Sequence, residues 1–132
     1  MRHAIWALGF SLLLVAIPAR AHHSFAAQYD STKPVKLTGK VTKVEWTNPH
    51  IYFYIDVKDE NTGKVTNWAL EMGSPNALMR LGWSRNSMKL DDVVTVDATL
   101  AKDGSKLANV RTVVLTSTGK RLLAGSSEGT TP

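Results

Sequence analysis

The chain has 132 residues, a formal net charge of +5 at pH 7 and no cysteine. This length suits one domain with a single modest core, and the lack of cysteine excludes disulfides and thiol chemistry. The basic residues are spread along the chain instead of being clustered, which argues against a nucleic-acid-binding groove. We therefore expect one domain whose partners are not nucleic acids.

Residues 1–21 are typical of a secretory signal peptide. Met1-Arg2-His3 supplies a basic start, residues 4–17 are apolar, and Ala19-Arg20-Ala21 is a small-residue cleavage motif. The apolar run is shorter than the roughly 20 residues that a transmembrane helix needs. We expect a protein of the periplasm or the extracellular space, with no transmembrane segment after cleavage. Loss of the two signal arginines lowers the net charge to +3.

The expected cleavage after Ala21 gives the mature chain a histidine at its first position. The amine and imidazole of His22 can then chelate a metal together, with His23 beside them. Cleavage after Ala19 would instead leave Arg20-Ala21-His22, which binds copper through amine, amides and imidazole. Residues 22–34 have no regular period and predict an extended arm, which Phe25 and Tyr29 can anchor.

Alternating apolar and polar residues predict the strands that follow. The first extends from Val35 to Trp46, with a bulge near Lys43. After a turn over residues 47–49, the second strand covers residues 50–58. Its core face carries Ile51, Phe53, Ile55 and Val57. Residues 59–63 form a hairpin loop, and the third strand covers residues 64–72, with Thr66, Trp68, Leu70 and Met72 on one face.

The segment after the third strand has the punctuation of a short helix. Ser74 is a suitable N-cap, Pro75 suits the first helical position, and Gly82 ends the pattern. Three further strands are predicted over residues 94–100, 108–116 and 121–123. The tail, residues 124–132, is rich in Gly, Ser and Thr and predicts disorder.

The order of these elements predicts the fold. Three strands, a helix and two more strands follow one another as in the five-stranded OB-type barrel. We predict a mainly β fold, a small five- to six-stranded OB-like barrel over residues 35–123 with one short helix after strand three. An open β-sandwich is the alternative.

Four segments together carry a resemblance to a known family. They are Ala21-His22-His23-Ser24-Phe25 (AHHSF), the EWTNPH motif at residues 45–50, the WALEMGSPN motif at residues 68–76 and GWSRNS at residues 82–87. With them the chain resembles an uncharacterised family of small exported bacterial proteins that carry a domain of unknown function, and it is similar to periplasmic OB-fold proteins. It departs from the pattern at residues 90–92, where Pro-Gly-Asp would be expected. The resemblance implies the fold and export but no activity.

The second and third strands suggest a metal site. If their core faces match, either His50 or Tyr52 lies opposite Glu71, so a carboxylate is within reach of the histidine. The 13-residue arm can span about 40 Å, enough to return its histidines to this edge. Imidazoles beside a carboxylate suit copper or zinc. We expect a copper site from His22, His23, His50 and Glu71, with ligands resembling the histidine brace of copper monooxygenases.

A structural explanation of the same residues stands beside this one. The His-His pair can be an exposed feature of a flexible arm, and His50 can simply cap a turn beside Glu71. No convincing nucleophile, base and acid occur together, so we expect no enzymatic activity. The alternatives are a module that binds a peptide, glycan or small ligand through Tyr52, Tyr54 and Arg85, or a structural envelope protein. The ligand or periplasmic protein partner is not identified by the sequence.

Overall fold

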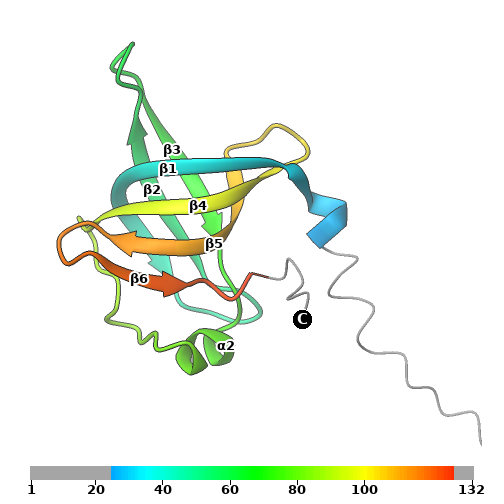
Figure 1. Cartoon of the computed structure of the whole chain (residues 1–132), viewed down its shortest axis with the longest axis vertical. Helices are drawn as coiled ribbons and strands as arrows, with labels where there is room; N and C mark the ends of the chain where they lie inside the picture. The colour runs from blue at the N-terminus through cyan, green and yellow to red at the C-terminus, as the bar shows by residue number, and fades with distance from the viewer. Residues whose placement is uncertain (1–24, 127–132) are drawn as a thin grey trace, which may run out of the picture.

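A computed structural model describes residues 25–126, which form a mainly β fold (Figure 1). The chain enters through a helical turn over residues 25–28. The elements that follow are β1 (Tyr29–Glu45), β2 (Tyr52–Lys58), β3 (Val65–Glu71), α2 (Pro75–Arg80), β4 (Val93–Ala101), β5 (Leu107–Leu115) and β6 (Lys120–Leu123). The predicted β-rich class and the short helix after the third strand are confirmed.

The six strands form one sheet in the order β3-β2-β1-β4-β5-β6, with antiparallel neighbours. In addition, β3 pairs in parallel with β5, where Ala69 to Glu71 lie opposite Leu107 to Asn109. Each of the five strands β1 to β5 is therefore hydrogen-bonded to two others of these five. β6 pairs with β5. The β2–β3 hairpin projects beyond the other strands, and α2 lies at the opposite end (Figure 1).

The core faces of β2 and β3 are the predicted ones. Phe53 lies opposite Leu70, and Ile55 lies opposite Trp68; all four side chains are buried. The register of β1 against β2 shifts between Val41 and Lys43, which confirms the predicted bulge. The strands come close together near Gly39, where a Cβ atom would lie 2.4 Å from the carbonyl oxygen of Asp56. Only glycine fits this approach.

The short helix has the predicted beginning. The Ser74 side chain accepts a hydrogen bond from the backbone N–H of Ala77 at 3.2 Å, and Pro75 is the first helical residue. Gly82, just beyond the helix, has a φ of +94°, a conformation that L side chains rarely adopt. Within residues 25–126, no helix has the length and apolar character needed to cross a membrane.

The beginning of β1 differs from the prediction. β1 starts at Tyr29 instead of Val35, so much of the predicted extended arm is strand, and the residues before it are helical. Phe25 and Tyr29 are buried against Ala101 of β4, and this apolar contact fixes the segment. Residues 29–34 do not alternate between apolar and polar types, and the register of β1 against β4 shifts between Tyr29 and Pro34.

Residues 124–126 also differ from the prediction, which places them in a disordered tail. Ala124 is fully buried, its N–H donates to the Arg111 carbonyl at 2.9 Å, and its carbonyl accepts from Gly73 at 2.8 Å. These backbone contacts leave no trace in the residue types, so the composition alone misplaced the boundary. The predicted signal peptide and residues 127–132 lie outside the described residues.

Candidate functional site

A buried carboxylate at the end of β3 gathers polar side chains from three parts of the chain. Glu71 is only 5% exposed. The Tyr29 hydroxyl from the start of β1 donates to Oε2 of Glu71, and Nδ1 of His50 contacts Oε1. Tyr52 of β2 lies directly opposite Glu71. We call these four residues the Glu71 cluster. A buried carboxylate is stable only with such partners.

The backbone places His50 at this edge. The register of β2 against β3 is one of the two predicted, with Tyr52 opposite Glu71 and His50 diagonal to it. Just beyond the strand ends, Ile51 donates to the carbonyl of Gly73 at 3.0 Å and accepts from Met72 at 2.8 Å. The prediction that His50 lies within reach of Glu71 is therefore confirmed.

His50 keeps one nitrogen available. Its side chain is 37% exposed, and its contact with Glu71 uses Nδ1. Nε2 makes no hydrogen bond with any of residues 25–126. A neutral imidazole that donates through Nδ1 carries its lone pair on Nε2. His50 can thus offer Nε2 to a metal or a proton while Glu71 holds the ring.

The phenols of the cluster are held in their neutral form. Burial raises the pKa of Tyr52 to about 12, and the Glu71 charge and hydrogen bond add to the effect. Burial and the same carboxylate raise the pKa of Tyr29 far above its ordinary value. Both phenols therefore remain hydrogen-bond donors beside Glu71 at neutral pH.

These raised pKa values predict how the protein responds to alkali. In the unfolded chain, tyrosines ionise near pH 10, so the folded state binds more protons above that pH. For Tyr52, the stability that it contributes is present below about pH 10 and is lost as pH rises through its folded pKa of about 12. We expect less phenolate absorbance at about pH 11 in the native protein than in urea, and a shallower alkaline loss of unfolding free energy in Tyr52→Phe. Identical native and unfolded titrations would contradict this.

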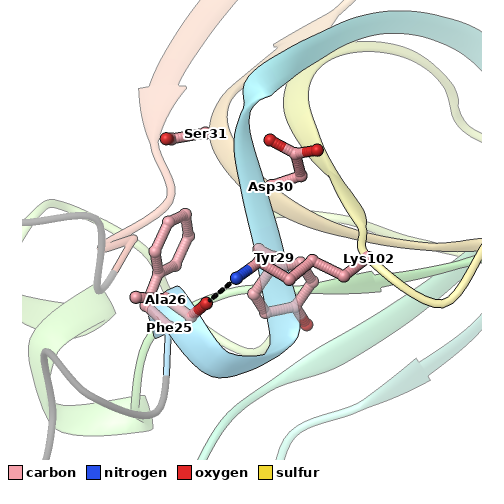
Figure 2. A pocket seen from close by; sticks show the side chains of 6 residues that line it. All are labelled: Phe25, Ala26, Tyr29, Asp30, Ser31 and Lys102. Atoms are coloured by element: carbon pink, nitrogen blue, oxygen red, sulfur yellow. Dashed lines mark hydrogen bonds between the residues drawn. The ribbon is translucent and has the colours of Figure 1, made fainter.

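Tyr29 also lines a hollow of about 230 Å³ (Figure 2). It is lined by Phe25, Ala26, Tyr29, Asp30, Ser31 and Lys102. The Lys102 ammonium group donates to the carbonyl of Ala26, and the Lys102 backbone donates to that of Gln28 at 2.9 Å. The Phe25 and Tyr29 rings lie 5.3 Å apart between centroids. Lys102 and the ring contact thus hold the amino-terminal turn beside the Glu71 cluster.

The other predicted ligand-binding residues, Tyr54 and Arg85, make no hydrogen bond with Glu71 or His50 among the described residues. The Tyr54 hydroxyl donates to Glu45 at 3.0 Å, and the Lys43 ammonium group lies 5.3 Å from the Tyr54 ring centroid. Arg85 is exposed between α2 and β4 and makes no hydrogen bond or ion pair with another described residue. Among the three residues predicted to bind a ligand, only Tyr52 belongs to the cluster.

The predicted metal ligands fall into two groups. His50 and Glu71 are together, whereas His22 and His23 lie outside the described residues. Over residues 25–126, no three side chains of His, Asp or Glu gather in a way that would hold a metal ion.

Tyr29 is the member of the Glu71 cluster that the sequence does not reveal. It was predicted only as an anchor for the arm, yet its hydroxyl contacts a carboxylate 42 residues away. Such a separation leaves no local pattern, and the pairing of β1 with β4 was not predicted to begin so early.

Comparison with known proteins adds a family but no activity. A family model matches residues 10–110, a range that contains the whole Glu71 cluster, and the family is described as one of unknown function. No curated protein matches the chain.

Proposed function

This chain belongs to the family of unknown function DUF6152, and from its own residues we propose that it is an exported copper-binding protein of the periplasm or the extracellular space. The proposed ligands are the amine and imidazole of His22 and Nε2 of His50, with His23 as a further donor. Glu71 orients His50 through its contact with Nδ1, the ring nitrogen that does not bind the metal. The proposed role is binding without catalysis.

The observation that carries this proposal is the contact between Nδ1 of His50 and the buried Glu71 carboxylate. Histidines that bind metals usually donate their other ring N–H to a carboxylate or carbonyl, which fixes the ring and makes it a better ligand. Glu71 supports such a role because it holds Nδ1 and leaves Nε2 to a partly exposed face. Among divalent ions, copper binds nitrogen ligands most tightly.

The position of the amino-terminal turn supports the participation of His22. Only two residues separate His22 from Phe25, and the two Cα atoms lie about 10 Å apart in an extended chain. Phe25 packs on Tyr29, whose hydroxyl contacts the same carboxylate that holds His50. The histidine therefore needs a short tether and not a long arm to approach His50.

The chemistry of the donors fits copper only if the terminus takes part. The described residues offer one free imidazole nitrogen at this edge, whereas the amine and imidazole of His22 would add a bidentate pair. A bound copper ion would supply Lewis acidity and one-electron chemistry. The chain's own contribution is to orient His50 and to bring the terminus near it.

We further propose that the sheet is an OB-like barrel. The parallel pairing of β3 with β5 and the helix directly after β3 support this architecture. In OB folds, ligands commonly bind on the face of strands two and three and on the loops that follow strands one and four. His50 lies in the loop after β1. Export is supported by the basic, apolar and small-residue segments within residues 1–21.

A second candidate function is metal-free binding of a peptide, glycan or small ligand. It is favoured by the partly buried Tyr52 beside Glu71 and by the nearby hollow with its two aromatic rings. The two charged side chains of the hollow already have partners within the protein, since Lys102 donates to Ala26 and Asp30 accepts from Thr32. The copper proposal therefore has the stronger support, and no described contact favours a purely structural role in the envelope.

The test is the state of the protein as the cell exports it. We expect the mature chain to start at His22 and to be recovered with copper, because a free amine at this position completes the donor set. Amino-terminal sequencing and metal analysis of the natively processed protein check both expectations. A chain that still starts at Met1 would contradict export and the copper site together.

A further inference from the structure

We propose that Tyr29 is a positioning residue which, through Glu71, fixes the tautomer of His50 and selects Nε2 as its free nitrogen. As a statement about metal binding, this inference rests on the proposed function. As a statement about the imidazole, it concerns the metal-free protein. It links a side chain of the amino-terminal segment to the chemistry of a histidine in the β1–β2 connection.

The first step is that both oxygens of Glu71 are engaged. Tyr29 donates to Oε2, while Nδ1 of His50 contacts Oε1. Because Tyr29 is 2% exposed and Glu71 is 5% exposed, water does not readily replace the phenol. Loss of the hydroxyl would leave Oε2 without this donor, and the carboxylate would turn toward the donors that remain, the Tyr52 phenol and Nδ1 of His50. Its orientation toward His50 thus depends on Tyr29.

The second step is that the carboxylate selects the His50 tautomer. A neutral imidazole has one N–H and one lone pair, and the hydrogen bond made by one nitrogen decides the role of the other. A carboxylate that accepts at Nδ1 keeps the proton there, so Nε2 keeps the lone pair. Without a well-placed acceptor, both tautomers are populated and Nε2 is less often available.

The third step is that Tyr29 belongs to the segment that carries the terminus. Its ring packs on Phe25, and Lys102 holds the turn that precedes it through the Gln28 carbonyl. The segment that would bring His22 toward the metal therefore also orients the His50 ring.

The chain provides a matched control. Tyr54 also donates its hydroxyl to a glutamate, Glu45, at 3.0 Å on a neighbouring strand. Among the described residues this second pair makes no hydrogen bond or ion pair with His50 or Glu71, although Glu45 lies opposite Tyr52 of the cluster. We call the contacts from Tyr29 through Glu71 to His50 the relay. Removal of the Tyr54 hydroxyl changes a second tyrosine–glutamate pair and leaves the contacts of the relay in place.

The experiment is NMR of the imidazole nitrogens of His50 in the metal-free, natively processed protein. In the wild type we expect Nδ1 to carry the proton and Nε2 the lone pair. Tyr29→Phe should give a mixture of tautomers, whereas Tyr54→Phe should retain the wild-type signals. Glu71→Leu, which removes the acceptor at Nδ1, should also disturb the tautomer, and it serves as a second variant if Tyr29→Phe folds poorly. A tautomer unchanged in a folded Tyr29→Phe or Glu71→Leu variant would overturn the inference.

Copper titration of the same variants separates this inference from the proposed function. We expect Tyr29→Phe to weaken copper binding about tenfold or more, the usual effect of losing a group that orients a ligand, and Tyr54→Phe to leave it unchanged. If the wild type binds no copper but the tautomer responds to Tyr29→Phe, the relay stands and the copper proposal fails. If the wild type binds copper but Tyr29→Phe does not change the tautomer, the relay is wrong and the copper proposal stands.

Discussion

Replacement of Phe53 by alanine is expected to lower the free energy of unfolding by about 3 to 5 kcal/mol. The ring is fully buried between β2 and the rest of the core, opposite Leu70 of β3. Its removal forfeits the burial of an aromatic side chain and leaves a cavity that the closely packed strands fill only partly. This loss is a large share of the stability of a small domain.

Trp68→Ala should have an effect of the same size, because this ring packs in the same core and lies opposite Ile55. Urea denaturation of the two variants measures the change. Val65→Ala, at a β3 side chain that is 54% exposed, is the control and should change stability by less than about 0.5 kcal/mol. Unchanged denaturation curves for Phe53→Ala and Trp68→Ala would mean that the core face has been assigned to the wrong side.

The sequence predicts the β2–β3 hairpin well because one face of each strand is buried. Burial of one face imposes a period of two on the apolar residues, and a one-residue error would bring the opposite face inward. For this reason the core residues and the contact between His50 and Glu71 were predictable from the alternation alone. The choice between the two possible registers was not, since both satisfy the same alternation.

The beginning of β1 and the last described residues were not predictable in the same way. Tyr29 reaches Glu71 only because the chain bends through a register shift against β4, and the residues around it do not alternate. Ala124 is held by backbone hydrogen bonds to Gly73 and Arg111, which any residue type can make. Contacts of this kind depend on the assembled sheet and not on a local pattern.

Copper affinity should depend on the amino terminus. Addition of one residue before His22 moves the free amine off the residue that carries the imidazole, so we expect copper binding to weaken strongly. Glu71→Gln should weaken it by about 10- to 100-fold, as for other groups that orient a metal ligand. Isothermal titration of the natively processed protein and these variants measures both effects. Equal affinity in the extended chain would contradict the role of the His22 amine.

The copper affinity of His50→Ala, compared with that of the natively processed wild type, tests the central claim most directly. The variant retains the terminal amine, His22 and His23, and loses only the imidazole that Glu71 holds. We predict a loss of affinity of about 100-fold or more, because one of about three nitrogen ligands is removed. If affinity is unchanged, the terminus binds copper by itself and His50 is not a ligand, which would contradict the proposed site.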